Sequence, residues 1–461
     1  VEPNELVDLA ISYNNAGFLS DYLASNVISN IGLTVNNDDV ISPVITFNDL
    51  TTSGNGLETN SGNDSVGVKL TWGSQVIADN TDDLNFIITD SCVSNNPLNT
   101  SCESSDYTLT STYSLINQPS LGSASLAFNI SGDEVVEPSE TISIGLVKDS
   151  NTPNHYFPSV GYVFPTINYT ITNDDKIAPY FTTATSNGNE GSTTADAGIK
   201  VGWDQDIAAN VPDLAITVAS SCAASGCVVG EDFNFTATES VSVFTTGSDK
   251  AAPGATGETL NFKIVGDAMV EPSEDVTLTL GSTDTDYVEF ASTPSHIRTI
   301  TNDDTLSISV ADVSVLESAA ANITFVWSET VAKNVPAFDI AIAMACDDLS
   351  ASSTCNMTGF DDFTAQTTVS LRTNGEVADI AGGNVLLNVP LVNDSSVEPT
   401  EVIAVGFTIP PAIQPYFSAA TISDISLSIL NDDYVEVSYA AGGADEADGN
   451  VSLQWSGYRV E

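Results

Sequence analysis

The sequence predicts an all-β protein built from tandem seven-stranded antiparallel β-sandwiches that are joined by short linkers. Three markers recur in one order along the 461 residues. The first is Val-Glu-Pro-x-Glu, the second is Asn-Asp-Asp, and the third is an alternating strand that ends in Trp72, Trp203, Trp327 or Trp455. The markers repeat at intervals of roughly 130 residues, a length that can bury its own core. Such a period predicts domains in a row rather than the coils of a solenoid.

The positions of the markers give the domain boundaries. Residues 40–175, 176–304 and 305–433 are three complete repeats, each of which ends at Asn-Asp-Asp. Residues 1–39 form a partial repeat with the C-terminal strands, and residues 434–461 form another with the N-terminal strands. Almost no residues lie between one Asn-Asp-Asp and the next repeat, and such short linkers favour a rigid rod.

The first complete repeat shows how the seven strands are predicted. Short alternating segments are bounded by Gly, Asn, Asp, Ser and Pro, which are turn residues. The strands are expected at 43–49, 66–72, 84–90, 107–114, 125–131, 141–147 and 166–175. No long helical period interrupts them, and the second and third repeats give the same order. This pattern predicts a two-sheet antiparallel sandwich.

The charge of the chain restricts its partners. The sequence contains 62 acidic and 10 basic side chains, which give a net charge of −52. Nucleic acid and anionic membrane surfaces both need a basic face, so neither is expected as a partner. No apolar run approaches the ~18 residues that span a bilayer, so membrane insertion of this segment is not expected. Cations are the expected partners, and a solvated acidic shell in saline water is the alternative explanation.

The six cysteines occur as three close pairs, one in each complete repeat. Two histidines are too few for mixed Cys and His zinc sites, and an isolated pair cannot make a four-thiolate site. Local disulfides are therefore predicted, with free buried thiols as the alternative, and disulfides indicate an oxidising compartment. The pairs are Cys92 with Cys102, Cys222 with Cys227, and Cys346 with Cys355.

Acidic residues are expected to collect at one end of each sandwich. Four elements reach this end: the loop between the first two strands, the turn before the fourth strand, the Val-Glu-Pro-x-Glu turn, and the Asn-Asp-Asp after the seventh strand. Six to eight oxygen ligands without histidine or thiolate are what Ca²⁺ binds. A plain solvated turn is the alternative, because Asp, Asn, Gly and Pro are turn formers. The candidate metal ligands are Glu58, Asp106, Asp133, Glu137, Glu140, Asp174 and Asp175 in the first repeat, Glu190, Asp232, Asp267, Glu271, Glu274, Asp303 and Asp304 in the second, and Glu317, Asp362, Asp394, Glu398, Glu401, Asp432 and Asp433 in the third.

These motifs resemble the Calx-beta domain, which occurs in the regulatory loop of the sodium–calcium exchanger, in an integrin subunit and in long bacterial surface proteins. The resemblance lies in the Gly-Asp turn followed by Glu-Pro-x-Glu and a strand, and in the closing Asn-Asp-Asp. It implies a seven-stranded, immunoglobulin-like sandwich with calcium ligands on these loops. By this resemblance Glu137, Glu140, Asp174, Asp175 and their counterparts are calcium ligands. The exchanger's domain ends in three aspartates, whereas the first is Asn here, which lowers the charge of the site.

The recurrence of the acids favours a structural role over a catalytic one. An enzyme needs one site, but these acids are the same in every repeat, and His155 and His296 occupy different places in their repeats. No enzyme activity is therefore expected. The predicted function is an extracellular, calcium-stiffened structural array, either part of a cell-surface adhesin or the subunit of an extracellular filament. Neighbouring repeats or subunits are the expected head-to-tail partners, with surface glycans or other cells as further partners. A calcium-dependent sensor or a carbohydrate-binding module is the alternative.

The two partial repeats supply different strands of a sandwich. Residues 1–39 are expected to supply the sixth and seventh strands, and residues 434–461 the first and second. Each piece alone would leave apolar faces and strand edges exposed. Either the neighbours continue in the same chain, or the two ends pair between subunits in the manner of donor-strand complementation, which would give a head-to-tail filament.

Overall fold

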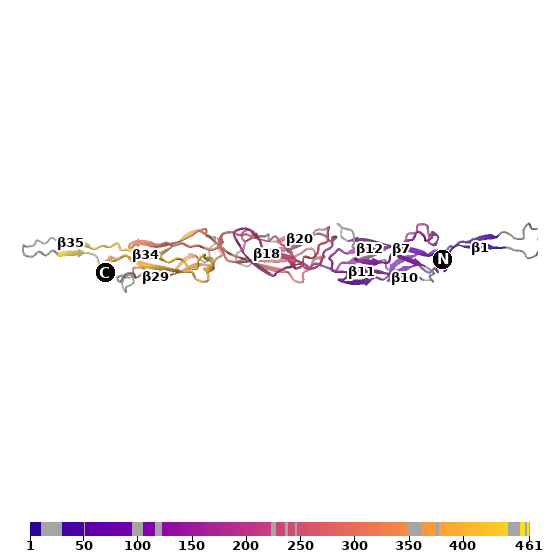
Figure 1. Cartoon of the computed structure of the whole chain (residues 1–461), viewed down its shortest axis with the longest axis horizontal. Coiled ribbons are helices and arrows are strands. Elements are labelled where there is room, and N and C mark those ends of the chain that lie inside the picture. Colours follow the sequence, from indigo (N-terminus) through magenta and orange to yellow (C-terminus); the bar gives the residue numbers. More distant parts are fainter. Residues whose placement is uncertain are drawn as a thin grey trace, which may run out of the picture.

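The chain folds almost entirely into β-structure. The computed structural model describes residues 1–10, 30–49, 51–94, 105–115, 122–222, 227–235, 238–244, 247–347, 362–373, 378–440, 452–456 and 459–460. Within these ranges the helical segments are three short 3₁₀ turns. The β-sandwiches follow one another along a single long axis, from the indigo N-terminal end to the yellow C-terminal end (Figure 1). The predicted all-β fold of tandem sandwiches is confirmed.

The strands of the three complete repeats occur in a shared order. In the first repeat they are β3 (Val44–Phe47), β4 (Ser53–Leu57), β5 (Gly62–Ser65), β6 (Val68–Thr71), β7 (Leu84–Ser94), β8 (Tyr107–Leu109), β9 (Thr112–Leu115), β10 (Ser123–Leu126), β11 (Phe128–Gly132), β12 (Glu140–Lys148), η1 (Asn154–Tyr156) and β13 (Ile167–Thr172). In the second they are β14 (Tyr180–Phe181), β15 (Thr185–Asn189), β16 (Ala195–Asp196), β17 (Lys200–Gly202), β18 (Leu214–Cys222), β19 (Phe233–Asn234), β20 (Thr238–Phe244), η2 (Gly254–Thr256), β21 (Glu258–Thr259), β22 (Lys263–Ile264), β23 (Met269–Val270), β24 (Glu274–Gly281) and β25 (Ser295–Thr301). In the third they are β26 (Val313–Leu316), β27 (Ala321–Trp327), β28 (Thr330–Val331), β29 (Phe338–Cys346), β30 (Thr368–Arg372), β31 (Gly383–Val389), β32 (Ser396–Val397), β33 (Glu401–Thr408), η3 (Gln414–Tyr416) and β34 (Ile425–Leu430).

Short strand pairs lie at the two ends of the molecule (Figure 1). At the N-terminal end, β1 (Glu5–Leu9) and β2 (Ile31–Val35) pair antiparallel. At the C-terminal end, β35 (Glu436–Ala440) and β36 (Ser452–Ser456) pair antiparallel, and β37 (Arg459–Val460) pairs in parallel with β32. Every residue of β1 and β2 is exposed, so this pair has no core of its own.

One five-stranded sheet recurs in each complete repeat. Its strand order is β4-β13-β12-β7-β9 in the first repeat, β15-β25-β24-β18-β20 in the second and β26-β34-β33-β29-β30 in the third. The opposite layer is made of shorter pairings, which are β10-β6-β3 and β5-β11-β8 in the first repeat, β14-β17-β21 and β16-β22-β19 in the second, and β27-β31 in the third. Buried side chains of both layers share one core, which is the arrangement of a sandwich.

The outer strand of each five-stranded sheet runs parallel to its neighbour. β4 pairs with β13, β15 with β25 and β26 with β34, all in parallel. The sequence pattern assigned these three segments to the loop between the first two strands. β4 and β15 read Ser-Gly-Asn-Gly-Leu and Thr-Ser-Asn-Gly-Asn, so they carry almost no apolar alternation that could have indicated a strand.

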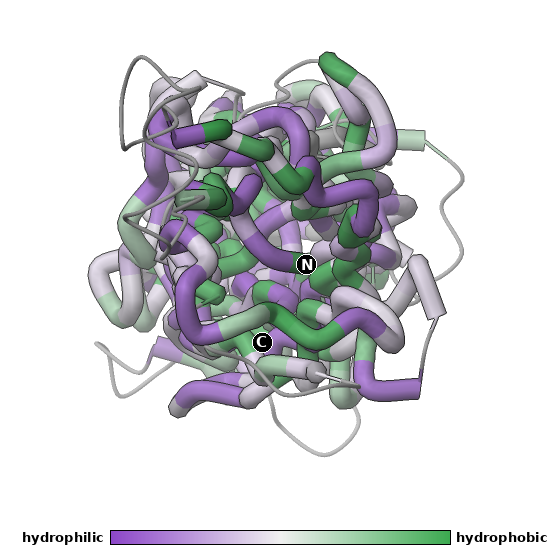
Figure 2. Tube along the Cα trace, turned by 90° about the vertical axis from the view of Figure 1, so that its right-hand side faces the viewer, coloured by the Kyte–Doolittle hydropathy of each residue, from purple (hydrophilic) through white to green (hydrophobic). Residues whose placement is uncertain are grey.

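Three hydrophobic cores lie along the chain, one in each complete repeat. Trp72, Trp203 and Trp327, which end the alternating strands, are 1%, 0% and 7% exposed, so they are core residues and not stacking platforms for sugars. Figure 2 looks along the long axis and shows hydrophobic and hydrophilic residues intermingled, and the burial of β13 and β27 alternates from one residue to the next. That period of two residues places the apolar side chains between the layers.

Each core contains one valine that comes from the preceding repeat. Val136 lies in the second core and Val270 in the third, and both are 0% exposed. Each belongs to a Val-Glu-Pro motif, and Val1 occupies the same position in the first core. The backbone beside Val270 also crosses the junction, because β23 pairs in parallel with β28 of the next repeat. The junction between repeats is therefore a packed, hydrogen-bonded contact and not a free linker.

One predicted disulfide is confirmed within the described residues. Cys222 and Cys227 are bonded, with their Cα atoms 5.7 Å apart. Cys92 and Cys346 are also disulfide-bonded, and the predicted partners Cys102 and Cys355 lie outside the described residues. Among the described residues, no helix has the length and apolar character needed to cross a membrane.

Candidate metal centres at the ends of the repeats

Parallel pairing of the outer strand brings two acidic segments to the same end of each sandwich. β15 ends at Asn189, so Glu190 leaves the sheet directly beside Thr301, the last residue of β25. Asp303 and Asp304 follow β25. Because parallel neighbours point the same way, the glutamate and the two aspartates meet at one edge.

The second repeat contains two groups of carboxylates at this edge. In the end cluster, oxygens of Glu190, Asp267 and Asp304 all lie within 4.8 Å of one another. In the turn cluster, oxygens of Asp232, Glu271 and Glu274 lie within 4.8 Å of one another. The end cluster joins the outer strand, the Gly-Asp turn and the Asn-Asp-Asp. The turn cluster joins the turn before β19 to the Glu-Pro-x-Glu turn and the first residue of β24. All six are among the ligands predicted from the sequence.

Four of these six carboxylates are buried, and among the described residues none of the four has a cationic partner. Glu190 is 2% exposed, and both of its carboxylate oxygens are buried with only the backbone N–H of Asp267 as a weak donor. Glu274 is 8% exposed, and its Oε2 is buried without an amide or hydroxyl donor. An unpaired buried carboxylate costs several kcal/mol, and two of them ~4 Å apart repel by about 4 kcal/mol in a partly wet site. Such groups persist when they are protonated or when a cation binds between them.

The pKa values follow from this burial and repulsion. Burial, together with the charges of Asp232 and Glu190, raises the pKa of Glu271 to about 9. Burial and the charge of Asp232 raise the pKa of Glu274 to about 8. Burial and the charge of Asp267 raise the pKa of Glu190 to about 7. Among the described residues, no Lys or Arg contributes to any of these shifts.

The first repeat has the same arrangement. Burial raises the pKa of Glu137 to about 10, with further increases from Asp106, Glu58 and Glu140. Burial and the charges of Asp133, Asp106 and Asp175 raise the pKa of Glu58 to about 8. Both oxygens of Glu58 are buried, and its carboxyl group shares a hydrogen bond with that of Glu137. Burial and Asp174 raise the pKa of Asp175 to about 6. These are the first-repeat ligands predicted from the sequence, and the structure brings them into mutual electrostatic contact.

In the third repeat the residues of the end cluster lie close together, whereas those that correspond to the turn cluster do not form a group among the described residues. Oxygens of Glu317, Asp432 and Asp433 lie within 4.8 Å of one another. Asp394 donates its backbone N–H to Glu317 Oε1 at 2.8 Å. Asp362 and Glu401 are buried and Glu398 is half-buried, but within the described ranges these three do not form a group of that spacing.

Some predicted ligands lie at the rim and order the loops. Asp174 Oδ1 accepts a hydrogen bond from the backbone N–H of Thr59 at 3.1 Å, and Asp303 Oδ1 accepts one from Gly191 at 3.0 Å. Both aspartates are exposed. The aspartate that precedes each Val-Glu-Pro accepts through one oxygen from the backbone N–H two residues later, at 2.7 Å for Asp133, 2.7 Å for Asp267 and 2.6 Å for Asp394. In the first two repeats it is the second aspartate of Asn-Asp-Asp that acts on the buried glutamate, since Asp304 belongs to the end cluster and the charge of Asp175 raises the pKa of Glu58.

The asparagine of Asn-Asp-Asp connects the two acidic loops, a role that sequence reasoning missed. Asn302 Oδ1 accepts from the backbone N–H of Glu271 at 3.4 Å, and its Nδ2 donates to the Asp304 carbonyl at 2.9 Å. Asn173 and Asn431 make the same pair of bonds in their repeats. The signal was present, because Asn occupies this position in all four copies of the motif.

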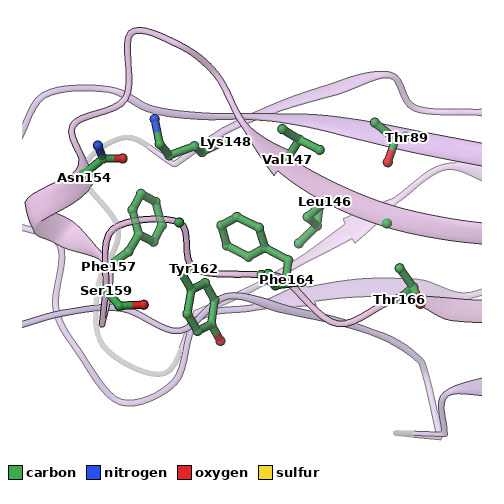
Figure 3. Close-up of a pocket in the computed structure, with 13 residues that line it drawn as sticks. Thr89, Leu146, Val147, Lys148, Asn154, Phe157, Ser159, Tyr162, Phe164 and Thr166 are labelled. Atoms are coloured by element: carbon green, nitrogen blue, oxygen red, sulfur yellow. The ribbon is translucent and has the colours of Figure 1, made fainter.

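A separate cavity of about 550 Å³ lies in the first repeat (Figure 3). Its wall is formed by β12 and by the segment between η1 and β13. Phe157, Tyr162 and Phe164 line one side, with Tyr162 and Phe164 in edge-to-face contact at 5.0 Å. Lys148, Asn154 and Ser159 add polar groups. The corresponding segment is shorter in the second and third repeats.

No family model matches this chain, and no curated protein sequence matches it. Among solved structures, CBD12 from CALX1.2 is 12% identical, covers 55% of this chain and 100% of that chain, and has a TM-score of 0.21. The extracellular cadherin domains 1–4 of protocadherin gamma B7 are 10% identical, cover 92% and 83% of the two chains, and have a TM-score of 0.27. The titin I-band fragment I67–I69 is 8% identical, covers 85% and 96%, and has a TM-score of 0.26.

The fold and the acidic ends together define the class of this molecule. It is a tandem β-sandwich repeat protein with buried carboxylate clusters at the repeat ends.

Proposed function

We propose that this chain is an extracellular calcium-binding structural repeat protein of the Calx-beta type. Ca²⁺ binds at the acidic end of each complete repeat and stiffens the junction to the next one. The array is part of a cell-surface adhesin or a subunit of an extracellular filament. A disulfide between Cys222 and Cys227 supports an oxidising location.

The observation that carries the proposal is the buried, unpaired carboxylate oxygen. Both oxygens of Glu58 and of Glu190 are buried at equivalent positions of two repeats, and no Lys or Arg of the described residues acts on either carboxylate. A solvated acidic shell would leave such oxygens in contact with water. The donors are all hard oxygen atoms, which Ca²⁺ prefers over the softer transition metals.

The position of the clusters links cation binding to the junction. A cavity of about 220 Å³ is lined by Asp106, Asp133 and Glu137 of the first repeat and by Asp206 and Asp249 of the second. A cation in this region would reduce repulsion between acids of two repeats. This supports stiffening of the array by Ca²⁺ over a role confined to one domain.

The test is a calcium titration of thermal stability at a fixed high sodium concentration. Specific sites raise the melting temperature at micromolar to millimolar calcium, because a ligand stabilises the state that it binds. Magnesium at the same concentration is the control, since it demands a tighter octahedral geometry. A melting temperature that depends only on total ionic strength would contradict the proposal.

A carbohydrate-binding module is the second candidate, and the first-repeat cavity favours it. Its aromatic side and its polar groups form the combination that accepts a sugar ring. Binding of the full chain to a glycan array, compared with Tyr162→Ala, tests this candidate. Loss of a bound glycan in the variant would support it, and no glycan retained by the parent chain would exclude it. We propose a role without catalysis for both candidates, because the acidic clusters recur at equivalent positions.

A further inference from the structure

An asparagine of each following repeat contacts the acidic end of the repeat before it. Asn334 Nδ2 donates to Glu274 Oε1 at 3.1 Å, and Asn210 Nδ2 donates to Glu140 Oε1 at 3.4 Å. Both glutamates are the second glutamate of Val-Glu-Pro-x-Glu, and both asparagines lie seven residues after the buried tryptophan of their repeat. The same contact therefore occurs at two independent junctions.

The backbone of the junction holds this asparagine in place. Ala332, two residues before Asn334, donates its N–H to the Val270 carbonyl at 3.0 Å. Ala208, two residues before Asn210, donates to the Val136 carbonyl at 3.0 Å. Because both valines are 0% exposed in the core of the following repeat, the distance between the asparagine and the glutamate is fixed by packing.

The carboxylate of Glu274 contacts both the junction and the turn cluster. Oε1 accepts from Asn334, Oε2 is buried without an amide or hydroxyl donor, and the Asp232 carboxyl group shares a hydrogen bond with Glu274. A Glu274 oxygen lies within 4.8 Å of oxygens of Asp232 and Glu271. The side chain is 8% exposed, so it has little room to rotate. The amide on Oε1 therefore fixes the orientation in which Oε2 can meet a cation.

We infer that Asn334 is a positioning residue for the calcium ligand Glu274 of the preceding repeat, and that Asn210 does the same for Glu140. The cation site of one repeat is then completed only when the next repeat is docked. This inference rests on the proposed calcium function and adds the source of the orientation. By linkage, whatever the docked repeat adds to calcium affinity, calcium adds equally to docking.

The test measures where along the full chain calcium affinity changes. Hydrogen exchange read by mass spectrometry gives the calcium concentration at half-protection for residues 266–281 and, separately, for residues 132–148. Asn334→Ala should raise the midpoint of 266–281 about tenfold, the loss typical when an outer-shell partner of a metal ligand is removed. It should leave 132–148 unchanged. Asn210→Ala should give the opposite pattern.

Asn322→Ala is the matched control, because Asn322 is an exposed asparagine of the third repeat whose Oδ1 accepts one side-chain hydrogen bond. It should move neither midpoint. If Asn334→Ala instead lowers the protection of 266–281 without calcium and leaves its calcium midpoint unchanged, the contact is purely structural. That result would overturn the inference. Shifts of both segments in either variant would also overturn it. If the parent chain has no calcium midpoint, the proposed function itself fails, and the inference fails with it.

Discussion

At the residue scale, the asparagine of each Asn-Asp-Asp motif explains why the first position is not an aspartate. Its Oδ1 accepts from the Glu-Pro-x-Glu turn while its Nδ2 donates to the backbone of its own loop. An aspartate could accept but could not donate. It would also add a negative charge beside carboxylates whose pKa values are already raised. The asparagine thus favours loop geometry over additional negative charge at the site.

We expect Asn302→Asp to destabilise the second repeat. The Asp304 carbonyl loses its donor, a loss of about 1–3 kcal/mol, and the added charge increases repulsion in the calcium-free state. Differential scanning calorimetry without calcium should show a transition several degrees lower than in the parent chain. The exposed Asn388, which also donates through Nδ2, gives the control variant Asn388→Asp. An unchanged transition in Asn302→Asp would contradict the role assigned to this amide.

Glu271→Gln should have opposite effects with and without calcium. Because burial and neighbouring acids raise the pKa of Glu271 to about 9, removing its charge relieves repulsion and should raise the calcium-free melting temperature at pH values near 9. The same change removes a ligand, so calcium affinity in the second repeat should fall by more than about tenfold. Calorimetric titration measures the affinity. Glu289→Gln, at an exposed position of the same repeat, should change neither quantity. Retention of the full number of calcium sites in Glu271→Gln would refute the ligand assignment.

At the element scale, the parallel outer strand brings the acidic loops together. β4, β15 and β26 end one residue before Glu58, Glu190 and Glu317, beside the ends of β13, β25 and β34. An antiparallel edge strand would have sent those glutamates to the opposite end of the sheet. The strand therefore determines the site even though it contributes little to the core.

Calcium-free stability should fall as pH rises. The unfolded glutamates have pKa values near 4.3, whereas those of Glu190, Glu274 and Glu271 are raised to about 7, 8 and 9. Between these limits the folded state binds more protons than the unfolded state, so unfolding releases protons and stability decreases with pH. The contribution of these groups is full below about pH 4 and is lost as pH rises through about 9.

Chemical denaturation between pH 5 and 9, with a chelator and with calcium, measures this dependence. Calcium should flatten the profile, because it binds the ionised carboxylates and opposes their repulsion. A calcium-free stability that increases with pH across this window would show that the clusters are not buried as described.

The sequence predicted most strands and the acidic ends, and the reasons for its failures are physical. β7 and β12 alternate strongly because one face of each is buried. β4 and β15 sit at an edge with Gly, Asn, Ser and Thr, so their pairing leaves no hydrophobic period. The predicted strand 107–114 divides into β8 and β9, which pair with β11 and β7 in different layers. A turn between layers leaves alternation intact, so the pattern could not reveal it.

The junction was also beyond the reach of pattern reasoning. Val136 and Val270 belong to motifs that were interpreted as turns carrying calcium ligands. Each side chain instead enters the core of the next repeat. A single valine has no periodicity, and the residue that it contacts lies about 60–70 positions away in a different repeat.

At the scale of the whole molecule, three cores are connected end to end by these junctions (Figure 1). Each junction combines a buried valine, a short parallel strand contact and the acids of the preceding repeat. Stiffness of the rod should therefore depend on the charge state of those acids. The strand pairs at the two ends present apolar side chains to solvent, among them Leu6 at 68% and Val437 at 61% exposed.

Removing calcium should make the array more flexible before any domain unfolds. Uncompensated carboxylates then repel across each junction, while the cores lie away from the site. Small-angle scattering with and without a chelator should show a change in maximum dimension, and circular dichroism should stay constant. A chain with the Glu-Pro-x-Glu residues neutralised should no longer respond to the chelator. Those residues are Glu137, Glu140, Glu271, Glu274, Glu398 and Glu401. An unchanged maximum dimension in the parent chain would rule out stiffening by calcium at the junctions.

The most direct test of the central claim is a crystal or cryo-electron microscopy structure determined in millimolar calcium. One ion should be held by Glu190, Asp267 and Asp304, and another by Asp232, Glu271 and Glu274. The distances from Ca²⁺ to the ligand oxygens should be about 2.3–2.6 Å. Glu274 should coordinate through the oxygen that Asn334 leaves free. Clusters that contain only water or hydrogen-bonded, protonated carboxyl groups at that calcium concentration would contradict the account.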